Sequence, residues 1–212
     1  MKLLSVNVAL PRTVTWKGRF VKTGIFKSPV DHRVAVRKYN LTGDQRADLS
    51  VHGGPSKAVY ACPSEHYPLW RTELPDMDIP FAMSGENFTT EGMSEQTVRI
   101  GDRYTVGSAT LAVSEPRVPC YKLAIRFGRD DIVQRFLQSG RCGFYFRIIE
   151  EGHTQADDLI TLTAQHPAAV TVADIYNIYV TRTADPDLLQ RALQIDSLGD
   201  SWREQIQNQL RR

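Results

Sequence analysis

The sequence predicts a mostly β protein with some α-helix (α+β), in which a distorted β-barrel with short helices precedes a C-terminal three-helix appendage. Two patterns lead to this prediction. Short apolar runs separated by glycine turns follow one another at close spacing, which is typical of a barrel rather than of a parallel sheet with helical crossovers. From residue 171 onward the pattern is purely helical. We therefore expect one domain over residues 1–165 and a three-helix extension over residues 170–212.

Strands are expected through most of the first domain. Residues 3–8 are strand-like in composition, and residues 32–37 alternate as a half-buried strand does. Residues 13–21 predict a hairpin that turns at Lys17-Gly18. Further short strands are expected at residues 58–61, 97–102, 103–107, 110–114, 143–149 and 158–163.

Helix start and stop residues mark the remaining segments. Residues 63–74 predict a first helix that Pro75 stops, and residues 130–138 predict an amphipathic helix that ends before Gly140. In the extension, a capping or N1-proline pattern precedes each helix: Thr171-Val172-Ala173-Asp174, Asp185-Pro186 and Asp200-Ser201-Trp202.

Bulk composition argues against several classes of protein. The 212 residues carry a formal net charge of +2, which gives no case for nucleic-acid binding. No apolar run approaches the length of a membrane span. The cysteines, Cys62, Cys120 and Cys142, are odd in number and widely spaced, which argues against a disulfide framework and a zinc ribbon. We therefore expect a cytoplasmic protein that binds neither nucleic acid nor membrane.

Cys120 is the strongest candidate for chemistry. It lies between Pro119 and Lys122, three residues after Arg117, where an apolar run gives way to a short helix. The thiolate is the reactive and metal-binding form of cysteine, and nearby cations favour it. Two interpretations remain open, an activated or metal-binding thiol and a buried filler at a strand-to-helix turn. The other two cysteines lack such neighbours and are expected to be structural.

A glycine loop forms a second candidate site. In His52-Gly53-Gly54, two glycines allow positive φ and let backbone amides approach an anion. Lys57 could pair with a phosphate, and His52 could take part in proton transfer. The alternative is a tight turn between strands with a histidine packed beside it.

A third motif is Gly85-Glu86-Asn87, where a carboxylate beside a carboxamide could bind a heteroaromatic ring or cap a turn. None of the three motifs is decisive alone, but their order is specific. The chain resembles the MOSC domain of molybdenum cofactor sulfurases over about residues 6–163, and residues from about 170 look like the extension of YiiM-type members. The motifs that carry the resemblance are His52-Gly53-Gly54-Pro55-Ser56-Lys57, Gly85-Glu86-Asn87-Phe88, Ile100-Gly101-Asp102 and Pro116-Arg117-Val118-Pro119-Cys120-Tyr121-Lys122.

The resemblance implies a distorted MOSC β-barrel with a molybdenum cofactor (Mo-molybdopterin) site. The family's key cysteine matches Cys120, which is therefore expected to ligate molybdenum. His52 would act beside it in catalysis by supplying protons. The family is also associated with pyridoxal phosphate. The residues expected to bind the cofactor are Gly53, Gly54, Lys57, Glu86, Asn87, Arg117 and Lys122.

The resemblance also implies an activity. YiiM-type relatives reduce N-hydroxylated substrates, including purine bases such as N-hydroxylaminopurine, and thereby detoxify them. The sequence contains no iron–sulfur cysteine pattern and no dinucleotide fingerprint, so we expect the electrons to come from a separate reductase. Two alternatives remain, a persulfide carrier at Cys120 and a non-catalytic cofactor-binding or storage module. The sequence leaves the oligomeric state open.

Overall fold

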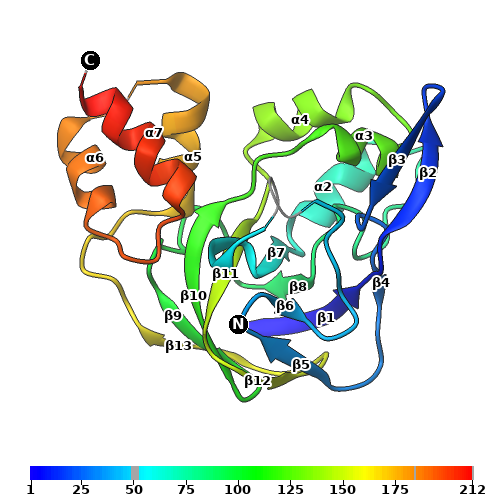
Figure 1. Ribbon diagram of the computed structural model, residues 1–212, viewed down its shortest axis with the longest axis horizontal. Helices are drawn as coiled ribbons and strands as arrows, with labels where there is room; N and C mark the ends of the chain where they lie inside the picture. Colours follow the sequence, from blue (N-terminus) through cyan, green and yellow to red (C-terminus); the bar gives the residue numbers. More distant parts are fainter. Residues whose placement is uncertain (49–52, 184, 212) are drawn as a thin grey trace.

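An eight-stranded mixed sheet forms the centre of the protein in a computed structural model, which describes residues 1–48, 53–183 and 185–211 (Figure 1). The α+β class is confirmed. Across the sheet the strands are β13 (Ile160–Ala164), β9 (Arg103–Val106), β10 (Ala109–Pro116), β11 (Phe144–Glu150), β7 (Val59–Pro63), β8 (Phe88–Glu91), β1 (Lys2–Val8) and β4 (Ser28–Pro29). All neighbours are antiparallel except β7 and β8, which run parallel.

The edge of the sheet at β13 approaches the opposite edge, where β1 and β4 lie, but no continuous ladder of backbone hydrogen bonds joins the two edges among the described residues. β4 is two residues long and pairs only with the far end of β1, at Asn7 and Val8. The near end of β1 is therefore available to the segment before β13. There the Leu3 N–H donates to the Asp158 carbonyl at 3.0 Å, and Lys2 forms a bridge with Leu159. The described strands thus form an open sheet with touching ends, not the closed barrel that the strand spacing suggested.

Two small sheets complete the β structure. One contains β12 (Gly152–Thr154), β5 (Val34–Arg37) and β6 (Asn40–Leu41). The other is the expected hairpin of β2 (Arg12–Trp16) and β3 (Arg19–Thr23). Lys17 and Gly18 both have positive φ, at 50° and 76°, so the predicted turn is confirmed.

Residues 97–102 correct one prediction, because they do not form a strand. Their hydrogen-bonding groups are used elsewhere: the Ile100 N–H donates to the Val170 carbonyl, and the Gly101 N–H donates to the Val113 carbonyl, both at 2.8 Å. Arg99 contributes only an isolated bridge to Thr171. The segment therefore joins the sheet to the chain that enters the extension.

Three short helices cover the sheet beside the hairpin: α2 (His66–Glu73), α3 (Tyr121–Phe127) and α4 (Ile132–Ser139). The first helix begins later than predicted, because Pro63 still belongs to β7 and lies opposite Thr90 of β8. Between α2 and α4, the rings of Trp70 and Phe136 stack with centroids 4.2 Å apart. A second apolar core therefore lies under these helices.

The C-terminal helices are α5 (Val172–Thr181), α6 (Pro186–Leu193) and α7 (Asp200–Leu210). The predicted capping box is present, since the Asp174 N–H donates to Thr171 Oγ1 at 3.0 Å and the Thr171 N–H donates to Asp174 Oδ2 at 2.8 Å. Ile175 and Trp202 belong to the same apolar core as the sheet. The division of the chain near residues 165–170 stays a prediction. Among the described residues, no helix is both long and apolar enough to span a lipid bilayer.

Candidate functional site

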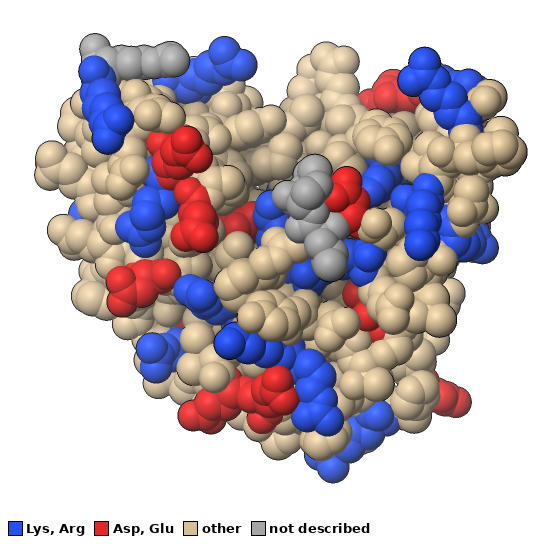
Figure 2. Space-filling view, in the orientation of Figure 1, with Lys and Arg blue, Asp and Glu red and all other residues tan. Residues whose placement is uncertain are grey.

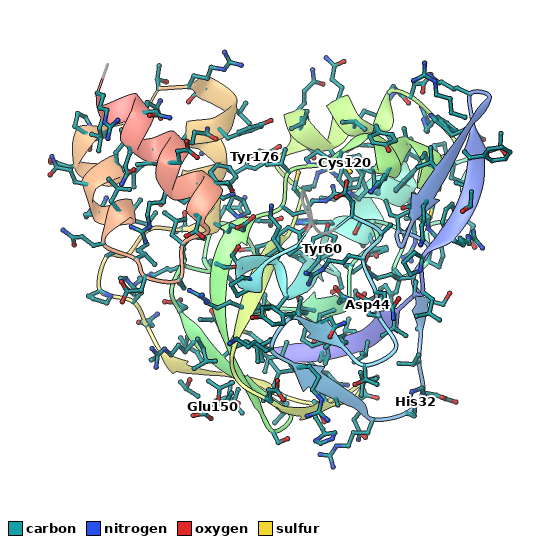
Figure 3. The ribbon with its side chains drawn as sticks, in the orientation of Figure 1. His32, Asp44, Tyr60, Cys120, Glu150 and Tyr176 are labelled. Atoms are coloured by element: carbon teal, nitrogen blue, oxygen red, sulfur yellow. The ribbon has the colours of Figure 1, made fainter. Side chains whose placement is uncertain are left out.

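One small cavity brings together residues from six separate parts of the chain. It has a volume of about 100 Å³ and opens to solvent. In Figure 3, Cys120, Tyr60 and Asp44, which all line it, lie in the same part of the molecule, whereas His32 and Glu150 lie at the lower edge. The described lining residues are Thr23, Gly24, Ile25, Lys27, Asp44, Gln45, Arg46, Ala47, Lys57, Tyr60, Ser84, Gly85, Asn87, Arg117, Val118, Cys120, Lys122 and Tyr145.

Cys120 reaches this cavity because the chain leaves β10 and turns into α3 at this point. Its backbone is extended (φ −123°, ψ 171°), and its carbonyl accepts from the Leu123 N–H at 2.9 Å. The helix therefore begins at Tyr121, which confirms the short helix expected after Cys120. The Cys120 side chain is partly exposed.

The other two cysteines differ from Cys120. Cys62 and Cys142 are buried, as expected for structural thiols. Burial raises the pKa of Cys62 well above its ordinary value and raises the pKa of Cys142 to about 11. The Cys142 thiol also donates to the Phe136 carbonyl at 3.2 Å. Both thiols therefore stay protonated at neutral pH.

Arg117 places a buried positive charge in the wall of the cavity. Its side chain is 5% exposed, and Nη2 donates a long hydrogen bond of 3.4 Å to the Ser84 carbonyl. Nη1 is buried and has no hydrogen-bond partner, and none of the described acidic residues forms an ion pair with this guanidinium. Because a buried unpaired donor is costly, Arg117 is a strong candidate to bind an anion.

The backbone of Arg117 is fixed by a glycine. The Arg117 N–H donates to the Gly143 carbonyl at 3.0 Å, while the Gly143 N–H donates to Glu95 Oε1 at 2.7 Å. Gly143 has φ of 71°, and a Cβ there would lie 2.2 Å from the Ala61 carbonyl oxygen. Only glycine fits this contact, so Gly143 holds the start of the Arg117–Cys120 segment against the sheet.

Cations outnumber acids in the described wall. Five lining residues are Lys or Arg, and Asp44 alone is acidic. Asp44 is already occupied, because it pairs with Lys27 and accepts from the Ala9 N–H at 2.9 Å. Figure 2 shows several Lys and Arg side chains near the centre of the visible face. The five cations are Lys27, Arg46, Lys57, Arg117 and Lys122.

Two of these cations have structural duties as well. Burial lowers the pKa of Lys27, and its ion pair with Asp44 opposes that shift. Arg46 Nη2 donates to the carbonyls of Tyr39 at 2.7 Å and Ala58 at 2.8 Å, and also to that of Lys57. Arg46 therefore ties two loops together where they form the wall.

Asn87 lines the cavity, and both the oxygen and the nitrogen of its amide form hydrogen bonds within the wall. Oδ1 accepts from the Tyr60 N–H at 3.2 Å. Nδ2 donates to the Asn7 carbonyl at 3.2 Å and to Asp44 Oδ2 at 3.0 Å. Asn87 therefore holds three segments of the wall together.

Glu86 lies behind the cavity wall and is fully buried. Its carboxylate accepts from the Ala82 N–H at 2.7 Å, Ser84 Oγ at 2.7 Å and Thr89 Oγ1 at 2.9 Å, and also from the Tyr67 hydroxyl. The structure therefore places Glu86 as a support for Ser84, which does line the cavity.

The glycine loop is described only in part. His52 lies outside the described residues. Gly54 is exposed, has φ of 92° and precedes the 3-10 helix η1 (Pro55–Lys57). Gly53 is half-buried, and among the residues that the structure describes, only Lys57 of this loop lines the cavity.

Sequence reasoning missed several wall residues, including Lys27, Asp44, Tyr60 and Ser84. The Lys27–Asp44 pair spans 17 residues, and the Asp44–Asn87 hydrogen bond spans 43. No local pattern could join such positions. Residues 41–48 around Asp44 are charged and typical of turns, but no local pattern assigns them to a site.

The side chains available as metal ligands limit the kind of metal that this cavity could bind. Among the described residues, no three His, Cys, Asp or Glu side chains are grouped as a metal site. A single thiolate suits a metal that arrives in a cofactor with ligands of its own. The unpaired Arg117 and the neighbouring lysines suit the anionic groups of such a cofactor. These residues therefore fit a phosphate-bearing molybdenum cofactor.

Comparison with known proteins identifies the family. Residues 48–161 match the MOSC domain, and residues 170–212 match the YiiM-like, 3-alpha helix domain. YflK of Bacillus subtilis (strain 168) is 37% identical over 95% of this chain and 90% of its own. A protein of Gibberella moniliformis named "Reductase" is 33% identical over 84% of this chain but only 32% of its own length. The crystal structure of YiiM from Geobacillus stearothermophilus has a TM-score of 0.83 and 33% identity, covering 99% of this chain and 98% of that one. The chain therefore belongs to the MOSC domain family and continues into a YiiM-like three-helix domain.

Proposed function

We propose that the protein binds the molybdenum cofactor beside Cys120 and reduces N-hydroxylated compounds such as N-hydroxylaminopurine with electrons from a separate reductase. The observation that carries this proposal is the cavity itself, which is lined by a partly exposed thiol and by a buried guanidinium whose Nη1 has no hydrogen-bond partner. Membership of the MOSC family, which is associated with this cofactor, supports the same assignment.

Five wall residues have roles in this proposal. The Cys120 thiolate ligates the metal, since soft thiolates suit it. Arg117, Lys57 and Lys122 bind the anionic groups of the cofactor through charge-assisted hydrogen bonds. When bound, the cofactor supplies two-electron redox chemistry. Asn87 holds the wall in place from inside the protein.

The reaction consumes protons as well as electrons. Reduction of R–NH–OH with two electrons and two protons gives R–NH₂ and water. His52 remains the proposed proton donor. Burial raises the pKa of Tyr145 to about 12, so its phenol can donate hydrogen bonds in the cavity but stays protonated.

The electron source is a further part of the proposal. The related reductase supports an oxidoreductase role for this chain. The match covers only 32% of that protein's length. A separate reductase is the partner that this chemistry requires.

The test is molybdenum content and turnover after expression in a host that makes the cofactor. We expect about one molybdenum per chain and reductase-dependent loss of N-hydroxylaminopurine, both abolished in Cys120→Ser. Cys142→Ser, in which a buried thiol is changed, is the matched control and should keep both. Full activity in Cys120→Ser would refute the proposal. Labile sulfur on Cys120 without metal would indicate a sulfur carrier, and bound cofactor without turnover would indicate storage.

A further inference from the structure

Glu115 is a buried carboxylate between the cavity and the three-helix extension. It lies near the end of β10 and is 2% exposed. Its Oε1 is 3.6 Å from Nζ of Lys57, which lines the cavity. Burial raises the pKa of Glu115, and Lys57 opposes this shift. The carboxylate and the ammonium are therefore coupled across the cavity wall.

The other side of Glu115 contacts the extension at Gly199, which immediately precedes α7. A Cβ added at Gly199 would lie 1.9 Å from Glu115 Oε2, 3.0 Å from its Cδ and 3.3 Å from Ser56 Oγ. The backbone of Gly199 is in an ordinary conformation (φ −59°), so the close approach explains the glycine. Gly199 thus packs against both Glu115 and the residue before Lys57.

Other contacts already attach this loop to the sheet. Ser197 Oγ donates to the Val113 carbonyl at 3.0 Å, and Arg147 Nη1 donates to the Asp196 carbonyl at 3.2 Å. Trp202 lies in the shared apolar core. The extension is therefore attached at several points besides Glu115, whose carboxylate faces Ser56 and Trp202 as well as Lys57.

We propose that the three-helix extension positions Lys57 for anion binding through Glu115, with Gly199 fixing where the carboxylate lies. A lysine has a long, flexible stem, and ordering it before the ligand arrives lowers the entropic cost of binding. Glu115 and Gly199 are therefore positioning residues, and neither contacts the anion. This inference rests on the proposed function, in which the cavity holds an anionic group.

The test is a double-mutant cycle on phosphate affinity. Full-length protein made without the molybdenum cofactor is titrated with inorganic phosphate by calorimetry. We expect Lys57→Met, Glu115→Gln and Gly199→Ala each to weaken binding roughly tenfold, the effect of one charge-assisted contact. In the double variant, Gly199→Ala should not lower the phosphate affinity below that of Lys57→Met alone. The substitution at Gly199 acts by displacing Lys57, and that lysine is absent from this variant. Glu204→Gln, an exposed change on α7, is the control.

The outcomes separate this inference from the function on which it rests. The inference would be overturned if Gly199→Ala weakened phosphate binding equally in the wild-type and Lys57→Met backgrounds. It would also be overturned if Glu115→Gln and Gly199→Ala left the phosphate affinity unchanged. If Glu115 were only a nearby negative charge, Glu115→Gln would strengthen binding, which would also overturn it. Should Gly199→Ala lose its near-UV circular dichroism, the cycle is run with the nearly isosteric Glu115→Gln. Wild-type protein that binds no phosphate would remove the anion site and this inference together.

Discussion

The guanidinium carbon of Arg117 lies 5.3 Å from the centroid of the Tyr60 ring, within the range of a cation–π contact. The Tyr60 hydroxyl is held at its far end, where it donates to the Cys142 carbonyl at 2.7 Å. Burial raises the pKa of Tyr60 well above its ordinary value, so the ring faces Arg117 as a neutral phenol. The contact orients the guanidinium without neutralising it, which leaves the charge available to an anion.

Replacement of Arg117 should therefore reduce anion affinity more than stability. We expect Arg117→Met to weaken phosphate binding by about tenfold to a hundredfold, because one or two charge-assisted hydrogen bonds are lost. Its free energy of unfolding should stay within about 1 kcal/mol of wild type, because an unpaired buried charge is removed with the side chain. Calorimetry and urea unfolding measure the two effects.

Arg117→Lys is the matched control, since it keeps the charge and loses the planar fork. It should retain part of the affinity. A large loss of stability in Arg117→Met with unchanged phosphate affinity would show that Arg117 serves packing alone.

Local features of the site could be predicted from the sequence, and long-range ones could not. The turn at Cys120 and the short helix after it follow from neighbouring residues. Glu86 was expected to face the cofactor, but its partners Tyr67 and Thr89 surround it in the core. Only three-dimensional packing decides which way such a carboxylate points.

The strand error at residues 97–102 has the same origin. The apolar alternation there is real, since Val98 and Ile100 are buried. However, the Ile100 N–H bonds to Val170, which is 70 residues away at the start of the extension. The apolar alternation of residues 97–102 reports only which side chains are buried. It does not reveal that the backbone of this segment bonds to Val170.

Glu86→Gln should destabilise the protein. The carboxylate accepts four hydrogen bonds, and an amide would turn donor hydrogens toward donors. We expect a loss of about 2–4 kcal/mol in the free energy of unfolding, measured by urea denaturation. Glu91→Gln, an exposed change on β8, should differ from wild type by less than about 0.5 kcal/mol. Equal stability of the two variants would contradict the buried network.

Cys120 should be the thiol that reacts in the native protein. Cys62 and Cys142 are 2% and 1% exposed, and burial raises the pKa of both, so their thiolates are scarce at pH 7.5. Iodoacetamide should add one group per chain by intact mass spectrometry, and peptide mapping should locate it at Cys120. Cys120→Ser should take up none, whereas Cys142→Ser should react like wild type. Rapid labelling of Cys62 would indicate that the core opens around β7.

Stability should depend on pH through Glu115. Its native pKa is raised by burial above the ordinary 4.5, so the native state binds this proton more tightly than the unfolded state does. The stabilisation that Glu115 contributes is thus complete below the unfolded pKa and is lost as pH rises through the native pKa. The free energy of unfolding of wild type minus that of Glu115→Gln should therefore fall as pH rises above the ordinary value of 4.5, as measured by urea unfolding at a series of pH values. The same difference for exposed Glu204→Gln should stay flat. A rising difference for Glu115 would mean that attraction to Lys57 outweighs burial, so that folding lowers the pKa of Glu115 instead of raising it.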